Sequence, residues 1–273
     1  MPAQTRPLGS MQGRVALVTG ASSGIGAAIA RVFVDAGARV HGVARRADAI
    51  ASEVGSAAVD EGRCVPHAVD VGDPDAIEAL ADDLAVNDPV DTLVCAAGTN
   101  VTERRLAQLT NETWDSLVRV NLSGVFYTLR PMLDQLRERN GDVVLISSVA
   151  AAWPDHSGPA YQATKAGLLG LARGAGMDEH GNGLRVSTIM PGIVNTPILD
   201  KRPVPPSDLL REWCVQPEDV AQACLCAVTL PARANIAEMT IVATRLQSMG
   251  RTQQANPTLP EELRPDGPIT AGS

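Results

Sequence analysis

Short β-branched stretches alternate with longer stretches rich in alanine and leucine from Gly13 to about Ala243. This alternation is typical of repeated strand–helix–strand units, in which successive strands are parallel and helices cover them. It restricts the possible folds more than any other feature of the sequence. Because both faces of such strands are buried, they are nearly continuous apolar stretches. Those stretches predict strands over residues 14–19, 38–44, 63–69, 92–96, 142–147, 184–190 and 238–242.

Helices are expected in the stretches between these strands, several of which begin with proline or an acidic residue. Right-handed crossovers place such helices on both faces of the sheet. We therefore predict an α/β fold, a Rossmann-type doubly wound parallel sheet of about seven strands, with ligands outside the carboxyl ends of the strands. The expected helices cover residues 25–36, 74–84, 111–140, 159–180 and 217–230.

The chain of 273 residues is expected to form a single Rossmann-type domain over residues 13–246. The proline-rich segment 193–216 breaks the alternation and is interpreted as a substrate loop. Residues 1–12 are expected to be a flexible N-terminal segment. The tail 247–273 is polar and rich in proline and glycine, and its composition predicts loose order.

Composition excludes several classes of function. Twenty-three Lys and Arg against 31 Asp and Glu give a formal net charge of −8, which argues against general binding to nucleic acid or anionic membranes. The five cysteines show no CxxC spacing, so we predict neither a disulfide framework nor a metal site. Since no signal peptide or long apolar segment is found, we expect a cytoplasmic protein.

A glycine-rich turn follows the first expected strand and opens an alanine-rich helix. Glycines have no Cβ, so such a turn can bend tightly and admit a pyrophosphate at the helix N-terminus. A turn of this kind is weak evidence alone, but here it stands in the required strand-to-helix context. The candidate cofactor residues of this turn are Gly20, Ser22, Ser23, Gly24, Ile25 and Gly26.

The end of the second expected strand bears on the choice of cofactor. Ala44 stands where NAD-dependent proteins of this fold have an acidic residue for the ribose 2′-hydroxyl. Arg45 and Arg46 follow, and a guanidinium can grip a phosphate through two hydrogen bonds. The pair favours the 2′-phosphate of NADP(H); the alternative is two solvated arginines at a helix start.

Tyr161 and Lys165 lie four residues apart and therefore on one face of a helix. A neighbouring ammonium stabilises a phenolate and lowers the pKa of a tyrosine, which suits acid–base chemistry. Such a pair often arises by chance. Here Ser148 ends an expected strand shortly before it, and Asn121 lies in an expected helix.

With these residues the sequence resembles the short-chain dehydrogenase/reductase family, in its short single-domain branch. The resemblance covers about residues 13–243. It depends on TGASSGIG at residues 19–26, Asp70-Val71, Asn121, Ser148, YxxxK at residues 161–165, and Pro191-Gly192 followed by Thr196.

The resemblance implies a catalytic set. Tyr161 would protonate the carbonyl oxygen as hydride arrives from the nicotinamide, or take the proton in the reverse direction. Lys165 would hold the nicotinamide ribose and lower the pKa of Tyr161. Ser148 would orient the carbonyl, and Asn121 would hold a water that relays protons. Tyr161 and Lys165 would also contact the cofactor, with Asp70, Val71, Ala96 and Gly98 on its adenosine side and Pro191, Gly192, Ile193 and Thr196 at its nicotinamide end.

The chain departs from the family in two places. Cys95-Ala96-Ala97-Gly98 stands where the family usually has Asn-Asn-Ala-Gly, which puts the stability of this turn in question. The frequent glycine-rich ending of the family is also missing, so subunit contacts of the C-terminus do not transfer.

Several other residues are explained by ordinary structural roles as well as by substrate contact. His41, His67 and His180 are expected to be ordinary surface or loop residues, whereas His156 lies in a loop that should pass the substrate. Trp153 and Trp213 would line the pocket or only pack their loops. Lys201 and Arg202 would meet an anionic substrate or be solvated.

The function expected from these patterns is the NADPH-dependent reduction of a ketone or aldehyde to an alcohol. An alcohol dehydrogenase working in the oxidative direction is a close alternative, and a non-catalytic NADP(H)-binding sensor or scaffold is a distant one. An epimerase or dehydratase would normally need a larger C-terminal substrate domain. By resemblance, the helices near 111–139 and 161–173 would pair with their copies in a homotetramer or homodimer.

Overall fold

The sheet has the predicted doubly wound topology. The structure is a computed structural model, which describes residues 7–247 and 258–264. Its strands are all parallel and follow the order β3-β2-β1-β4-β5-β6-β7, so the winding reverses between β1 and β4. The strands are β1 Val15–Thr19, β2 Arg39–Ala44, β3 Cys64–Ala68, β4 Thr92–Cys95, β5 Asp142–Ile146, β6 Arg185–Pro191 and β7 Glu238–Ile241.

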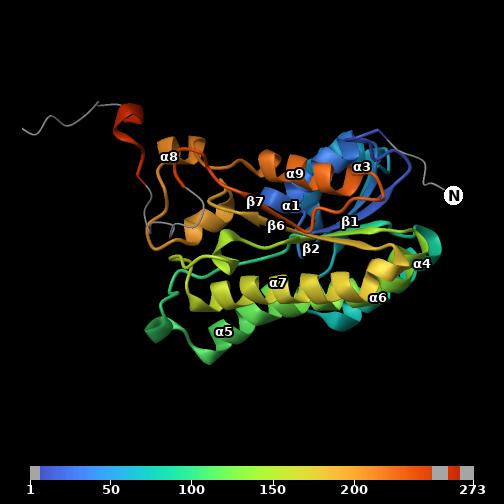
Figure 1. Cartoon of the computed structure of the whole chain (residues 1–273), viewed down its shortest axis with the longest axis horizontal. Coiled ribbons are helices and arrows are strands. Elements are labelled where there is room, and N and C mark those ends of the chain that lie inside the picture. The colour runs from blue at the N-terminus through green and yellow to red at the C-terminus, as the bar shows by residue number, and fades with distance from the viewer. Residues whose placement is uncertain (1–6, 248–257, 265–273) are drawn as a thin grey trace, which may run out of the picture.

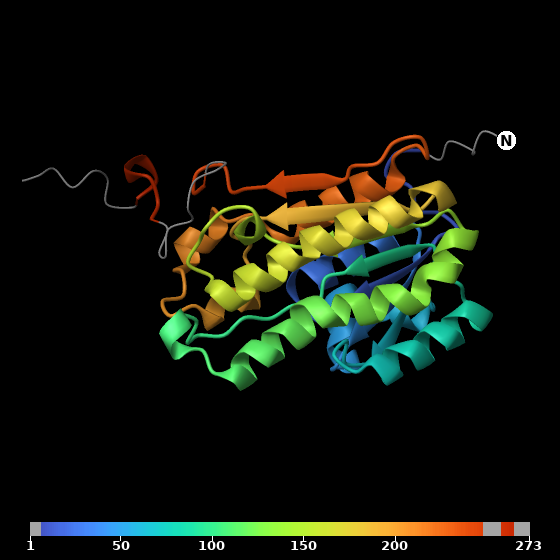
Figure 2. The ribbon, with the colours of Figure 1, turned by 60° about the horizontal axis from the view of Figure 1, so that its bottom comes forward.

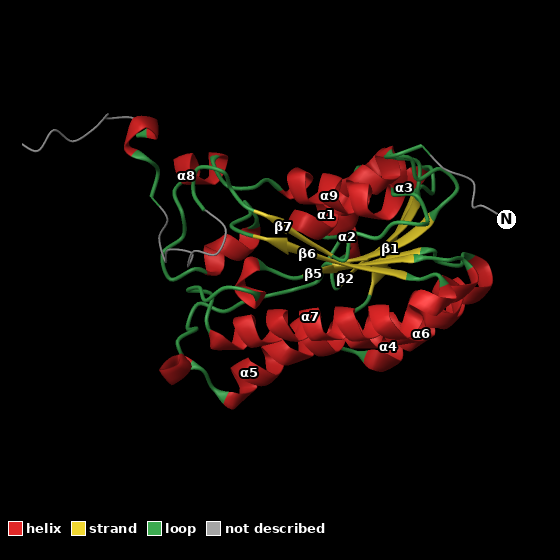
Figure 3. Cartoon of the chain, viewed as in Figure 1, coloured by secondary structure: helices red, strands yellow, loops and turns green. Residues whose placement is uncertain are grey.

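Helices cover both faces of this sheet (Figures 1 and 3). On one face α1 (Gly24–Asp35) packs against α9 (Pro217–Thr229). On the other lie α4 (Pro74–Asn87), α6 (Gly124–Glu138) and α7 (Pro159–Glu179), with α6 and α7 in front of the strands in Figure 2. The predicted α/β class with helices on both faces is confirmed.

Alternate residues of the central strands supply two hydrophobic cores, one on each side of the sheet. In β5, Val144 and Ile146 belong to the core under α1 and α9. Val143 and Leu145 belong to the core under α4, α6 and α7. Because successive side chains of a strand point to opposite faces, a strand buried on both faces must be apolar throughout. This explains the continuous apolar stretches of the sequence.

Several helix predictions need correction. The single helix expected over 111–140 is α5 (Asn111–Val118), a π-helical turn at Arg119–Ser123, and then α6. Three short helices were not predicted, because they are too short to show a helical hydrophobic period. These are α2 Ala47–Val54, α3 Ser56–Asp60 and α8 Asp208–Glu212, the last inside the expected substrate loop.

The N-terminal segment expected to be flexible is anchored at Gly9 and Met11, whereas Leu8 and Gln12 are exposed. Met11 is fully buried, and its N–H donates to the Ala36 carbonyl at 2.9 Å. The Gly9 N–H donates to Thr229 Oγ1 of α9 at 3.0 Å. Of the expected loose tail, residues 248–257 and 265–273 lie outside the described residues, whereas Leu259 is buried and a short 3-10 helix covers Glu261–Leu263.

Candidate active site

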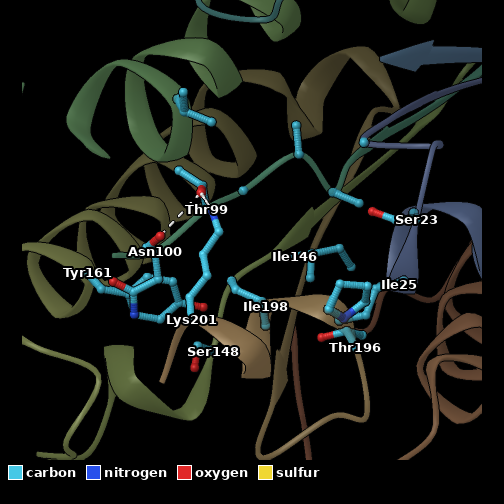
Figure 4. Close-up of a pocket in the computed structure, with 18 of the residues that line it drawn as sticks. Ser23, Ile25, Thr99, Asn100, Ile146, Ser148, Tyr161, Thr196, Ile198 and Lys201 are labelled. Atoms are coloured by element: carbon cyan, nitrogen blue, oxygen red, sulfur yellow. Dashed lines mark hydrogen bonds between the residues drawn. The ribbon is translucent and has the colours of Figure 1, made fainter. Parts of the chain in front are cut away.

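A cavity of about 690 Å³ opens at the carboxyl ends of the strands, where the winding reverses (Figure 4). This is where a doubly wound sheet binds its ligands. Of the predicted catalytic residues, Ser148, Tyr161 and Lys165 line it, and Asn121 does not. All the predicted cofactor residues line it as well: Gly20, Ser22, Ser23, Gly24, Ile25, Gly26, Arg45, Arg46, Asp70, Val71, Ala96, Gly98, Pro191, Gly192, Ile193 and Thr196, together with Tyr161 and Lys165.

The glycine-rich turn is shaped so that side chains would not fit in it. Gly20 has a φ of +72°, and a Cβ there would lie 2.9 Å from the Ala97 Cα. A Cβ on Gly26 would lie 2.4 Å from the Gly20 carbonyl oxygen. The turn leads into the N-terminus of α1, where free N–H groups and the helix dipole favour an anion. These residues therefore fit the pyrophosphate of a dinucleotide.

Thr19 stabilises the turn after β4, where Cys95 and Ala96 stand in place of the two asparagines usual in the family. Its Oγ1 accepts hydrogen bonds from the backbone N–H groups of Ala96 and Ala97, each at 3.1 Å. Cys95 is fully buried within β4, where burial raises the pKa of its thiol to about 12. The turn after β4 is thus hydrogen-bonded to the end of β1 in the absence of asparagine side chains.

Arg45 and Arg46 are exposed at the rim of the cavity, between β2 and α2. Within the described part of the chain neither forms an ion pair. Their guanidinium groups are therefore free of carboxylates and can meet a phosphate beside the end of β2.

Tyr161 and Lys165 lie in the first turns of α7, which begins at Pro159 behind Gly158. The Lys165 Nζ lies 5.7 Å from the centre of the Tyr161 ring and donates a hydrogen bond to the Ile146 carbonyl at 2.8 Å. Ser148 lies beside Tyr161, and its hydroxyl acts to lower the pKa of the phenol. Strand β5 and helix α7 thus bring three of the four predicted catalytic side chains together.

The electrostatics correct one expectation. Burial, followed by the Asp155 carboxylate, raises the pKa of Tyr161 to about 12, although the Ser148 side chain opposes this. Burial also lowers the pKa of Lys165 to about 8. The ammonium of Lys165 was expected to lower the pKa of the tyrosine. It instead donates a hydrogen bond to the Ile146 carbonyl and is not among the groups that shift the pKa of Tyr161.

Asn121 is fully buried in the π-helical turn between α5 and α6. Its Oδ1 accepts from the Thr99 N–H at 2.8 Å, and its Nδ2 donates to the Thr99 carbonyl at 3.0 Å and to Thr164 Oγ1 at 3.3 Å. The side chain thus fixes the loop after β4 to α7. The predicted water relay stays a prediction.

Sequence reasoning named Lys201 and Arg202 at the substrate end of the cavity and missed three further residues there. Arg104, Asp155 and Thr99 line it, as do Lys201 and Arg202 from the loop after β6. Figure 4 shows the Lys201 side chain reaching Thr99, whose Oγ1 accepts from Nζ at 2.7 Å. The sequence held no signal for the first three, because their positions depend on how three separate loops fold together.

Other candidates lie elsewhere. His156 is exposed and outside the cavity lining, unlike its neighbour Asp155. Trp153 and Trp213 do not line the cavity either. Gln247, just after the domain, was not predicted, yet its amide is buried without a hydrogen-bond partner beside Gly192.

The expectation for His41 and His67 was also wrong. His41 is buried in β2, where its Nδ1 lies 2.9 Å from His67 Nε2 and its Nε2 lies 2.8 Å from the Asp88 carboxylate. Among the described residues no group of His, Cys, Asp and Glu is arranged to hold a metal ion. That part of the chain also contains no helix long and apolar enough to cross a membrane.

The geometry defines a class, a dinucleotide-binding oxidoreductase of the doubly wound fold. Comparison with known proteins makes this specific. The sequence pattern of the short chain dehydrogenase family matches residues 14–204. The chain therefore belongs to this family.

Known relatives include a D-threitol dehydrogenase of Mycolicibacterium smegmatis, which is 37% identical over 194 residues, covering 68% of this chain and 72% of that protein. A 3-oxoacyl-(acyl-carrier-protein) reductase of Thermotoga maritima is 30% identical over 226 residues, covering 79% and 90%. Among solved structures, an alcohol dehydrogenase of the archaeon Thermococcus sibiricus complexed with 5-hydroxy-NADP is 28% identical. It aligns with a TM-score of 0.77 over 86% of this chain and 98% of that one.

Proposed function

We propose that this oxidoreductase uses NADPH to reduce a ketone or aldehyde to an alcohol, with Tyr161 as the proton donor. The observation behind the proposal is the position of Tyr161 in the cavity, beside Ser148 and backed by the buried Lys165. The bound nicotinamide would supply the hydride. The chain itself must place the carbonyl and deliver the proton.

Each side chain has a definite task in this reaction. Ser148 donates a hydrogen bond to the carbonyl oxygen, which gains negative charge as the reaction proceeds. Tyr161 gives its phenolic proton to the same oxygen. Since its pKa is raised to about 12, the hydroxyl is protonated at neutral pH, which suits a donor in reduction. Lys165, with a pKa lowered to about 8, can return a proton near neutral pH.

The preference for NADPH over NADH is the finer part of the proposal. Ala44 offers no carboxylate to a ribose 2′-hydroxyl, and Arg45 and Arg46 add positive charge at the cavity rim. A 2′-phosphate placed there would be bound by both charge and hydrogen bonds. The alcohol dehydrogenase of similar structure was solved with an NADP derivative, which supports the same choice.

The test is the fall of nicotinamide absorbance with NADPH and, side by side, NADH, over a panel of aliphatic, aromatic, cyclic and β-keto carbonyls. We expect turnover of at least one class with a clear preference for NADPH. A preference for NADH would overturn the role given to the arginines. Binding of NADPH without turnover would instead favour the sensor or scaffold.

A second candidate is oxidation of a secondary alcohol by the same residues. The similarity to a D-threitol dehydrogenase favours it. The same cavity serves both directions, because Tyr161 can accept the proton that it otherwise donates. Assays of the corresponding alcohols with NADP⁺ and NAD⁺ compare the two directions.

Assembly with further copies of the chain completes the proposal. The layer formed by α5, α6 and α7 exposes three large apolar side chains, Trp114, Phe126 and Met177. Exposed aromatic residues of this size favour protein interfaces. The proposed form is a homodimer or homotetramer joined through this layer.

A further inference from the structure

Arg104 is a buried cation at the substrate end of the cavity. Its side chain lies in the loop between β4 and α5, and only 7% of the residue is exposed. It forms no ion pair with any residue that the structure describes. Its Nε is buried and has no hydrogen-bond partner, while its Nη2 donates to the Lys201 carbonyl. An unpaired buried guanidinium is costly, so such groups are normally matched by an anion.

The surroundings hold this guanidinium in place. A Cβ on Gly158, the residue before α7, would lie 2.8 Å from the Arg104 Cβ and 2.5 Å from its carbonyl oxygen. The loop of Arg104 therefore packs directly against the start of α7, three residues before Tyr161. Electrostatic interaction with Tyr161 places the guanidinium near the reacting hydroxyl.

Neighbouring groups leave the positive charge unmatched. Asp155 interacts with Arg104, but one carboxylate oxygen of Asp155 accepts from the Ser157 N–H at 2.8 Å and also from the Ser157 hydroxyl. Arg202 adds a second guanidinium close by, and together with burial it lowers the pKa of Arg104. Lys201 adds an ammonium at the same end of the cavity.

The cofactor does not account for the cation. The pyrophosphate site is the glycine-rich turn, and the 2′-phosphate site is at Arg45 and Arg46. Both belong to the other end of the cavity, away from Tyr161. An anion at Arg104 must therefore come from the molecule that reacts at Tyr161.

We infer that the substrate is an anionic carbonyl compound, and that its carboxylate or phosphate binds the Arg104 guanidinium beside the reacting carbonyl group. The inference rests on the proposed function, because it names the substrate class of the same site. A guanidinium is well suited to a planar carboxylate. The nearby Asp155 favours a singly charged carboxylate over a doubly charged phosphate.

Matched pairs of ketones test the inference in the complete protein with NADPH. Acetoacetate is compared with its methyl ester, and dihydroxyacetone phosphate with dihydroxyacetone. We expect the anionic member of one pair to have the higher kcat/KM, and the pair concerned identifies carboxylate or phosphate. Arg104→Met should lower kcat/KM for that anion by about 30-fold or more and leave its neutral partner within about threefold. Arg105→Met removes a neighbouring exposed charge outside the cavity lining and is the control.

Preference of the wild type for both neutral members would overturn the inference. Equal losses for the anion and its neutral partner in Arg104→Met, with a shifted pH profile, would also overturn it, since Arg104 would then act through Tyr161.

A measurement independent of turnover separates this inference from the proposed function. The thermal midpoint of the protein loaded with NADP⁺ is compared in succinate and in succinamide at matched ionic strength. We expect succinate to raise the midpoint for the wild type and Arg105→Met but not for Arg104→Met. If no ketone reacts, the proposed function fails, but this comparison still tests the anion site. The same rise of the thermal midpoint in all three proteins, or no rise in any of them, would count against that site.

Discussion

The proposed reaction depends most directly on one functional group, the phenolic hydroxyl of Tyr161. Tyr161→Phe removes the proton donor and preserves the ring. Loss of a positioned general acid typically costs about 10²- to 10⁴-fold in rate, and we expect kcat to fall in this range. The variant should still bind NADPH, which a binding titration measures. Tyr127→Phe, on α6 and outside the cavity lining, is the matched control because Tyr127 is the other tyrosine of the chain. Near-normal turnover of Tyr161→Phe would rule out the proposed mechanism.

Arg45 and Arg46 allow a separate prediction about the cofactor. Charge-assisted hydrogen bonds contribute about 1.5–3 kcal/mol, so the double substitution to alanine should raise the KM for NADPH by roughly 10- to 100-fold. The KM for NADH should change little, because that cofactor has no 2′-phosphate. Steady-state kinetics with both cofactors provide the measurement, and Arg233→Ala, an exposed arginine away from the cavity, is the control. A parallel change for both cofactors would contradict the role given to the pair.

At this scale the sequence could predict the residues that a local motif fixes. Tyr161 and Lys165 are fixed by helical spacing, and the glycines of the first turn by their place between strand and helix. The role of Arg104 could not be predicted, because it depends on contacts with residues far along the chain. Arg104 packs against Gly158 and is hydrogen-bonded to the loop that contains Lys201. The same limit applies to His41. Its partners are on β3 and just after α4, and no local pattern joins them.

Among the elements, strands were easier to predict than helices. The central strands β1, β2, β4, β5 and β6 are buried on both faces, which leaves a continuous apolar signal. Helix α2 has only eight residues, and the π-helical turn at Arg119–Ser123 leaves the hydrophobic pattern of α5 and α6 nearly unbroken. Both features therefore stayed hidden in the sequence. The π-helical turn nonetheless matters for the site, because it contains Asn121.

The contact between β2 and β3 predicts a pH dependence of stability. His41 Nε2–H donates to Asp88, so the neutral His41 Nδ1 accepts from His67 Nε2–H. Burial lowers the pKa of both rings below the ordinary value of 6.5. The carboxylates oppose this shift, Asp88 for His41 and Asp83 for both rings. Arg39 adds to the lowering of the His41 pKa. In the unfolded chain these rings take up protons below pH 6.5, whereas in the fold they resist protonation. The free energy of unfolding should therefore fall as the pH drops below 6.5.

Urea unfolding at a series of pH values measures this effect. His67→Gln keeps a donor towards His41 but does not titrate, so its stability should fall less with acid than that of the wild type. His156→Gln, which replaces an exposed histidine, should leave the pH dependence unchanged. Identical pH profiles for the wild type and His67→Gln would contradict this prediction.

At the scale of the whole molecule, the topology decides where the site forms. The winding reverses between β1 and β4, and loops from these strands separate there to leave the cavity. This position could be predicted from the alternating pattern alone. The closing of the substrate end could not, because it depends on the segment after β6 crossing to the loop after β4 through Lys201 and Thr99.

The outer face of α5, α6 and α7 leads to a prediction about assembly. Phe126 on α6 is 48% exposed and Trp114 on α5 is 41% exposed. If this layer joins two copies of the chain, a charge placed in it must be buried without a partner, and such a burial opposes association strongly. Phe126→Glu should therefore shift the protein to a smaller species in sedimentation velocity at equal concentration, with an unchanged circular dichroism spectrum. Val86→Glu, at an 81% exposed position on α4, should leave the assembly intact. A wild-type protein that sediments as a monomer would exclude this contact. If both variants form the same assembly as the wild type, the contact between copies must lie elsewhere.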